Sequence, residues 1–184
     1  MNKGALIGIG LLVVILIMGV SSYNGLVGMN EAVTAKWSQV ENQLQRRADL
    51  IPNLVNTVKG YAAQEKDVMQ SVADARAKLA GAQGPAAKAQ ADSELSGALS
   101  RLLVVVENYP DLKSNQNFRA LQDELAGTEN RLSVARMDYN NVVQSYNAKI
   151  KTFPTSLFAN MLGFSAREYF KAQEGAQQVP NVQF

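Results

Sequence analysis

The first pattern in the chain is an uninterrupted apolar run close to its start. Residues 4–20 form 17 consecutive positions without a polar side chain. At about 1.5 Å of rise per residue, a helix extended to Tyr23 is roughly 30 Å long, the thickness of a bilayer core. The pattern therefore predicts a membrane anchor over residues 1–22. A cleaved secretory signal is the alternative, because Lys3 supplies a basic start and Ser22 a small residue near a cleavage point.

A helical seam follows the apolar run directly. The amphipathic pattern begins at Leu26, Met29 and Val33, with no turn after the apolar run to separate an export signal from a mature domain, so we expect the anchor to be retained. Steps of three and four then alternate along the chain, which is typical of coiled-coil-like helices with one narrow buried stripe. The seam positions are Val33, Trp37, Val40, Leu44, Arg47, Ile51, Leu54, Val58, Tyr61, Glu65, Val68, Val72, Ala75 and Leu79.

Prolines and capping residues divide the rest of the chain into helices. Pro85 is suited to a first helical position and Pro110 to a helix end, and Ser114 can cap the next helix. Ser165 and Glu168 have the spacing of a capping box. No stretch shows the period-two alternation of a strand. The predicted helices after the seam are residues 85–108, 114–153, 157–162 and 165–170.

Pro52 lies in the middle of the seam. Inside a helix, proline costs about 3 kcal/mol, whereas in the first turn its missing N–H costs little. We therefore predict a break or sharp kink between Ala48 and Pro52, with Asp49 as the N-cap. The predicted fold class is all-α, with a single-pass N-terminal transmembrane helix followed by an antiparallel four-helix bundle and short C-terminal helices. The bundle domain covers residues 23–174, and residues 175–184 form a tail.

The front of the seam has no evident partner within the chain. A continuous helix over residues 23–80 is about 85 Å long, whereas residues 85–108 return over only about 36 Å. The stripe must be buried either by folding back at a break or by a second subunit, and the second possibility leads us to predict a homo-oligomer. In the anchor, a GxxxG pair allows two spans to approach closely. The contact residues are Val33, Trp37, Val40 and Leu44, with Gly4 and Gly8 in the span.

Composition removes most catalytic classes. The chain has no His and no Cys, which excludes triads and zinc sites built on those residues. Lys and Arg total 18 against 16 Asp and Glu, so there is no dense cationic field for nucleic acid. No phosphate-binding loop or nucleophile elbow is present. We expect no enzyme activity, catalytic residue, metal, cofactor or small-molecule substrate.

Flanking charge predicts the orientation of the span. Lys3 and the amino terminus lie on one side, and the nearest cation after the span is Lys36. The positive-inside rule therefore favours a cytoplasmic N-terminus, with the remaining domain outside the cytoplasm.

Two polar clusters are candidate interaction sites. Arg46, Arg47 and Asp49 are suited to a partner or lipid-headgroup contact. The structural alternative, which we favour, is that Arg47 pairs with Glu107 or Glu129 of a neighbouring helix and fixes its register.

The second cluster is the polar turn Glu107, Asn108 and Tyr109. Its varied side chains suit a specific surface, but a connection between two helices needs such residues anyway. The structural duty is again favoured. Asn140 and Asn147, one heptad apart, place amides along one helix face, and a solvated face is the commoner reading.

Two blocks of residues resemble the LemA family. The first contains Trp37, Arg46-Arg47-x-Asp49-Leu50-Ile51-Pro52-Asn53-Leu54-Val55 and Val58-Lys59-Gly60-Tyr61. The second contains Glu107-Asn108-Tyr109-Pro110, Thr128-Glu129-Asn130-Arg131, Tyr139-Asn140, Tyr146-Asn147, Phe153-Pro154, Gly163-Phe164 and Tyr169-Phe170.

This resemblance implies a bacterial single-pass membrane protein with an N-terminal anchor, a soluble four-helix bundle and no established activity. With the orientation predicted from flanking charge, we expect the anchor in the inner membrane and the bundle in the periplasm or outside the cell. It also implies a possible partner among membrane metallopeptidases or other envelope proteins, near which such proteins are often encoded. We therefore expect a self-associating, membrane-anchored scaffold or interaction protein of the cell envelope. An accessory or regulatory subunit of a membrane metallopeptidase is the alternative.

Overall fold

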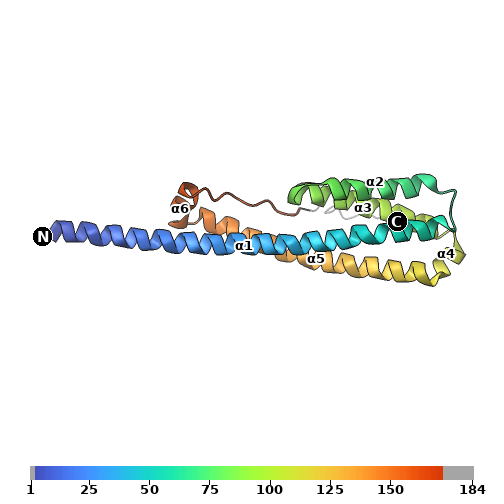
Figure 1. The fold of residues 1–184 in the computed structure, drawn as a ribbon, viewed down its shortest axis with the longest axis horizontal. Coiled ribbons are helices and arrows are strands. Elements are labelled where there is room, and N and C mark those ends of the chain that lie inside the picture. The colour runs from blue at the N-terminus through green and yellow to red at the C-terminus, as the bar shows by residue number, and fades with distance from the viewer. Residues whose placement is uncertain (1–2, 172–184) are drawn as a thin grey trace, which may run out of the picture. The chain divides into compact units, whose positions relative to one another are not determined.

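A computed structural model describes residues 3–171, and every regular element in this part of the chain is a helix (Figure 1). The all-α prediction is confirmed. The predicted tail, 175–184, lies outside the described residues. The helices are α1 (Lys3–Lys59), α2 (Lys66–Gly81), α3 (Gly84–Val106), α4 (Pro110–Ser114), α5 (Gln116–Lys151) and α6 (Thr155–Met161).

Two compact units divide the chain, and both contain part of α1 and part of α5. The described residues of unit 1 are 3–38 and 138–168, and those of unit 2 are 39–137 and 169–171. Each unit has its own buried core, described below.

Helix α1 passes through Pro52 without a break, so the predicted break between Ala48 and Pro52 is wrong. A proline leaves the carbonyl four residues earlier without its helical donor. That carbonyl belongs to Ala48, and it accepts a hydrogen bond of 2.8 Å from Nε of Arg76 on α2. The side chain of a neighbouring helix thus replaces the bond that Pro52 cannot make. Asp49 is no N-cap, and its carboxylate accepts from Gln45 within the helix.

The break in the seam falls later, between Lys59 and Lys66. The Val58 carbonyl accepts hydrogen bonds from the backbone N–H of both Tyr61 and Ala62, which closes the helix end. The seam shifts by one residue here, because Ala62 is buried and Tyr61 is 44% exposed. Residues 37–58 and 68–79 therefore lie on two helices.

Unit 2 is built from the second part of α1, helices α2, α3 and α4, and the first part of α5. Helices α2 and α3 form a hairpin across the short connection at Ala82 and Gln83, and they lie side by side in Figure 1. The described core residues of this unit include Val40, Leu44, Ile51, Leu54, Val58, Val72, Leu79, Leu95, Leu102, Leu112, Phe118 and Leu132, each at most 3% exposed.

The front of the α1 seam is buried within the chain, so its predicted exposure is wrong. Val33 is 2% exposed in unit 1, and Val40 and Leu44 are 0% and 2% exposed in unit 2. The partner of α1 along this stretch is α5 and not the shorter α3. Helix α5 has 36 residues and contacts α1 in each unit. In unit 1, Trp37 packs on Tyr139 with ring centroids 5.2 Å apart.

The ends of the later helices follow the predicted punctuation in part. Gly84 and Gly163 have positive φ, as expected of glycines at helix ends. Helix α5 is capped by Asn115, whose Oδ1 accepts from the Phe118 N–H at 3.0 Å, and not by Ser114. Ser114 instead belongs to α4, a short helix that Pro110 opens. The predicted helix over 165–170 is absent, because residues 164–171 have no regular structure.

Within residues 3–171, the first part of α1 is the one helical stretch that is long and apolar enough to cross a membrane. None of its most apolar window is buried. The large apolar side chains from Leu6 to Val20 are 40–71% exposed. A fully exposed apolar helix of this length is what a bilayer, and not water, accommodates.

Candidate functional site

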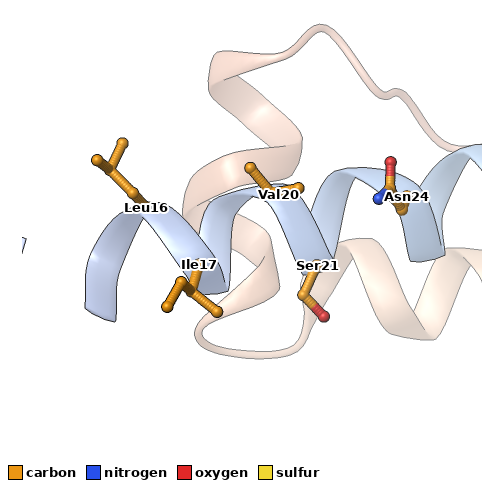
Figure 2. Close-up of a pocket in the computed structure, with 5 residues that line it drawn as sticks. All are labelled: Leu16, Ile17, Val20, Ser21 and Asn24. Carbon is orange, nitrogen blue, oxygen red and sulfur yellow. The ribbon is translucent and has the colours of Figure 1, made fainter. Parts of the chain in front are cut away.

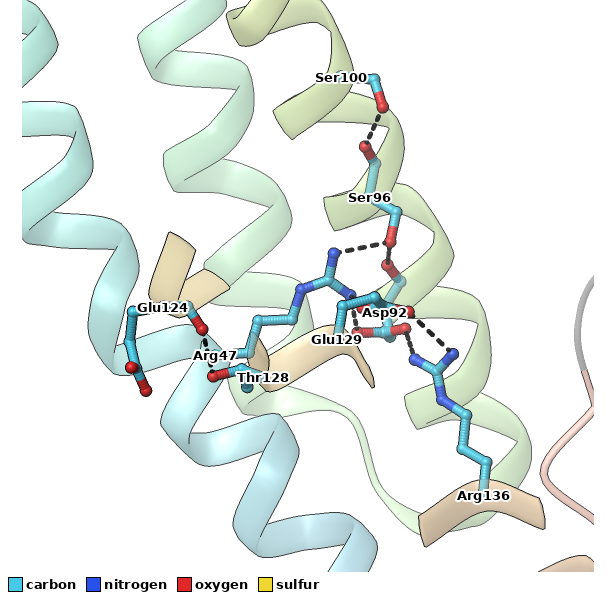
Figure 3. A network of polar contacts seen from close by, with 8 residues as sticks. All are labelled: Arg47, Asp92, Ser96, Ser100, Glu124, Thr128, Glu129 and Arg136. Carbon is cyan, nitrogen blue, oxygen red and sulfur yellow. Dashed lines mark hydrogen bonds and ion pairs between the residues drawn. The ribbon is translucent and has the colours of Figure 1, made fainter. Parts of the chain in front are cut away.

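Arg47 is the centre of a buried ion network in unit 2 (Figure 3). Its side chain is 7% exposed and that of Asp92 on α3 is 5% exposed. Arg47 Nη1 lies 2.7 Å from an Asp92 oxygen and 2.8 Å from an oxygen of Glu129 on α5. Arg47 Nη2 donates to Ser96 Oγ at 3.0 Å. One guanidinium therefore joins three helices.

A second arginine closes the network. Arg136 of α5 pairs with the other oxygen of Asp92 and, at 3.5 Å, with Glu129. Its guanidinium also lies over the ring of Phe170, 4.9 Å from the centroid. Two cations and two carboxylates thus balance in charge. An arrangement in which every charge faces an opposite one favours a fixed register between helices over proton transfer.

The sequence identified the residue at the centre of the network but only part of its surroundings. The structural interpretation of Arg47 is supported, and its predicted partner Glu129 is found. The other predicted partner, Glu107, pairs with Lys113 in the polar turn instead. Asp92 was missed, because it lies in a stretch of small residues with no helical pattern to mark it as buried. Arg46, by contrast, is an exposed residue paired with Glu124.

The polar turn is tied to the connection between α1 and α2 by hydrogen bonds. Tyr109 donates through its hydroxyl to Glu65 at 3.0 Å and accepts from Gln64 at 2.8 Å. Desolvation, followed by the contact with Glu65, raises the pKa of Tyr109. The predicted candidates Glu107 and Asn108 are exposed. Tyr109 therefore has the predicted structural role, whereas the side chains of Glu107 and Asn108 face solvent.

Asn147 has a structural role in unit 1 that the heptad pattern only hinted at. Its amide Nδ2 donates to the Arg167 carbonyl and its Oδ1 accepts from the Arg167 N–H, both at 2.8 Å. Tyr139 donates to the next carbonyl, at Glu168, over 2.7 Å. One amide pairs with both the N–H and the C=O of a single residue only where these point the same way, as in extended backbone and not in a helix, so Arg167 is held out of the predicted helix over 165–170.

The segment around α6 packs on α1 at the end of the apolar run. A Cβ placed on Gly19 would lie 3.2 Å from a ring carbon of Phe158, so a side chain here would require the ring to shift by a few tenths of an ångström. Four residues later, Tyr23 meets Phe164 edge-on with centroids 6.0 Å apart. These contacts fix α6 beside the last turn of the apolar segment.

A shallow, open groove lies on the same part of α1 (Figure 2). Its lining changes along the helix from apolar to polar side chains, which marks where a hydrophobic surrounding would end. The lining residues are Leu16, Ile17, Val20, Ser21 and Asn24.

The glycine pair of the span is open. Among the described residues, nothing lies within 4 Å of a Cβ placed on Gly4 or Gly8.

Within the described residues there is also no cluster of three or more His, Cys, Asp or Glu side chains that could hold a metal ion.

Comparison with known proteins shows the family. The chain matches the model of the LemA family over residues 36–184, which confirms the resemblance carried by the two sequence blocks. Magnetosome protein MamQ 2 of Paramagnetospirillum magneticum is 31% identical over 175 aligned residues, which cover 81% of this chain and 64% of that protein.

Two further relatives show the same partial coverage. Magnetosome protein MamQ of Magnetospirillum gryphiswaldense is 30% identical over 174 residues, 80% of this chain and 64% of its own length. Protein LemA of Metamycoplasma hominis is 25% identical over 138 residues, 74% of this chain and 63% of its own. The chain thus spans less than two thirds of the length of these relatives.

Proposed function

This chain belongs to the LemA family, and we propose that it is a membrane-anchored helical scaffold that acts by surface recognition and without catalysis. Family membership and the relatives support the coarser statement of a membrane-associated envelope protein. The finer proposal includes a cytoplasmic N-terminus, a domain outside the inner membrane and assembly with other proteins.

The observation that carries the proposal is the composition of α1. A single helix of 57 residues contains both the exposed apolar stretch and the buried seam. Its apolar part has no polar group to present to solvent, while its seam positions such as Val40 are buried. Such a helix serves as an anchor and as a core element at once.

The domain of the proposed scaffold is an antiparallel four-helix bundle. It comprises the part of α1 in unit 2, α2, α3 and the part of α5 in unit 2. Arg47 joins α1 to α3 and α5, and Arg76 joins α2 to α1. Short connections and facing apolar stripes are typical of such bundles.

Alkaline extraction of membranes tests the anchor. Arginine near the middle of a span costs about 3 kcal/mol, so Leu11→Arg combined with Ile15→Arg is expected to move the protein from the membrane pellet to the supernatant. Ala35→Arg, at an exposed position of α1 after the apolar run, is the matched control and is expected to stay in the pellet. Release of the wild-type chain at alkaline pH contradicts the anchor.

Self-association is proposed to occur through the span. The seam at Val33, Val40 and Leu44 is filled from within the chain, so it no longer supports an oligomer. Gly4 and Gly8 remain open to a second span. The protein mass in mild detergent, measured by light scattering, is expected to be a multiple of 20.0 kDa.

The matched control uses another glycine of the same span. Gly4→Leu with Gly8→Leu is expected to reduce the mass to one subunit, whereas Gly10→Leu, which also has nothing within 4 Å of its Cβ in the described residues, is expected to leave it unchanged. A wild-type mass of one subunit contradicts self-association but leaves the anchor untouched.

An accessory subunit of a membrane metallopeptidase or other envelope enzyme is the second candidate. The exposed side chains of Glu107 and Asn108, next to the fixed Tyr109, offer it a polar surface. Replacement of both by alanine is then expected to dissolve a heteromeric complex while the helical content stays the same. If the complex survives, this turn is not its contact.

A further inference from the structure

Helix α6 has an apolar side that nothing in the described chain covers. Leu157 and Met161, four residues apart and therefore on one face of the helix, are 62% and 74% exposed. Leu162 extends the face at 44% exposure, and Phe153, just before the helix, is 76% exposed. A surface helix in water normally turns polar residues outward at these positions.

The opposite side of α6 is the side that packs. Thr155 and Ala159 are 4% and 0% exposed, and Phe158 lies against Gly19 of α1. The exposed apolar face is therefore not a packing face that happens to lie open. It is a second apolar side on a helix that already has a buried one.

The place of α6 along α1 says what covers this face. Phe158 of α6 contacts Gly19, the last but one residue of the apolar run 4–20. Phe164, just after α6, contacts Tyr23 of α1. An aromatic residue such as Tyr23 is typical of the membrane interface. The groove on α1 also changes from apolar Val20 to polar Ser21 at this level (Figure 2).

We propose that the exposed apolar side of α6 is a second membrane contact, which inserts into the lipid leaflet beside the point where α1 leaves the bilayer. This inference rests on the proposed function, because it needs α1 to cross the membrane. The packed side of α6 holds the helix against the end of the apolar run through Phe158 and Gly19. Such an interfacial helix buries its apolar face at the boundary between headgroups and acyl chains.

Charge beside α6 fits the same surface. Lys149 and Lys151 form the basic last turn of α5, and both are exposed. They precede α6 by only a few residues, so two cations are available near this helix for the phosphates of anionic lipids. Apolar side chains backed by cations are the usual composition of a segment that rests on an anionic membrane.

Single cysteines carrying a bimane fluorophore test the contact, because the natural chain has no cysteine. The full chain is placed in vesicles of phosphatidylethanolamine and phosphatidylglycerol in which part of the lipid carries a nitroxide on its acyl chain. Met161→Cys and Leu157→Cys are expected to lose most of their fluorescence. Val13→Cys, within the apolar run, is the reference for a residue in lipid.

Asn141→Cys is the matched control for a residue in water. It is exposed, lies in the same unit and precedes Phe153 by about 18 Å along the chain's helical rise. It is expected to keep its fluorescence. Circular dichroism of each labelled protein checks that its helical content is unchanged.

The outcomes separate this inference from the proposed function. Quenching at positions 13, 157 and 161, with none at 141, supports both. Quenching at 13 alone overturns the α6 contact and leaves the anchor intact. No quenching at 13 overturns the anchor and the inference with it. Labels at 157 and 161 that are shielded but unquenched show that protein covers the face and overturn the lipid contact.

Discussion

Asp92→Asn is the change that tests the buried ion network most severely. The substitution keeps the size of the side chain but removes the charge that faces Arg47 and Arg136. Both side chains of the central pair are nearly inaccessible, at 7% and 5% exposure. Removing one member of such a pair leaves an uncompensated buried charge, which costs about 3–5 kcal/mol.

The expected loss lies at the lower end of that range, about 3 kcal/mol. The substitution leaves Glu129 in place, and its carboxylate oxygen lies 2.8 Å from Arg47 Nη1. The guanidinium therefore keeps one counter-charge. Against a typical total stability of about 5–15 kcal/mol, such a loss is large. It should shift the denaturant midpoint without changing the slope of the transition.

The assay is urea unfolding of the full chain in mild detergent, followed by circular dichroism at a helical wavelength. Glu94→Gln is the matched control, because Glu94 lies on the same helix and makes an exposed ion pair with Lys78. It should shift the midpoint far less than Asp92→Asn. A loss below about 1 kcal/mol for Asp92→Asn, the size of a surface pair, would refute the reasoning.

The double variant Arg47→Met with Asp92→Leu gives the opposite test. Replacing a buried pair by apolar side chains of similar size is often neutral. Among the described residues, Nε of Arg47 has no hydrogen-bond partner, so the pair is not fully satisfied. Arg136 keeps Glu129 in this variant. The double variant should recover most of the stability that Asp92→Asn loses.

Three further predictions concern single contacts. Asn147→Leu should cost about 1–3 kcal/mol and should make the extended segment that it binds sensitive to trypsin. Arg76→Met should destabilise the protein by about 1–3 kcal/mol, and by less in a Pro52→Ala background, where the alanine N–H can bond to the orphaned carbonyl. Arg46 lowers the pKa of Glu124 from its ordinary 4.5 through a hydrogen bond and its charge, so Arg46→Gln should destabilise at neutral pH and lose this effect as the pH falls through the lowered pKa.

For each of these predictions, one experimental result would contradict it. Trypsin resistance of Asn147→Leu would show that other contacts hold the segment. Equal losses for Arg76→Met with and without Pro52 would show that the two residues are not coupled. An effect of Arg46→Gln that persists at acid pH would show that the contact with Glu124 does not depend on the carboxylate charge, contrary to the sign of the pKa shift.

Periodicity predicted the buried stripes because they depend only on spacing within one helix. Ile51 and Leu54 are buried as expected, and the end of α6 at Gly163 has the positive φ that a glycine allows. Pro52 could not be judged in this way. Whether a proline breaks a helix depends on which group donates a hydrogen bond to the freed carbonyl. Here the donor is Arg76, which lies on another helix.

The candidate site shows the same limit. Arg47 stands out in the sequence because a charged residue interrupts an apolar seam. Its main partner Asp92 does not, because nothing local distinguishes it from other acidic residues. The helix expected from Ser165 and Glu168 failed for a related reason, since Asn147 takes the backbone of Arg167 into an extended pairing. Local signals are outweighed where a distant side chain supplies the hydrogen bonds.

Nitroxide scanning along α1 is the measurement that tests the central claim most directly, namely that one helix is both membrane span and core element. Single spin labels at each position from residue 8 to residue 44 of the full chain in vesicles would report collisions with oxygen and with a water-soluble relaxer. Up to Val20, the account predicts access to oxygen and not to the relaxer at every position except the contact sites Gly8 and Gly19. Beyond that point it predicts an unbroken period of about 3.6 residues, with minima of access at Leu26, Val33 and Val40. Access of the water-soluble relaxer to the apolar run, or loss of the period after Val20, would contradict it.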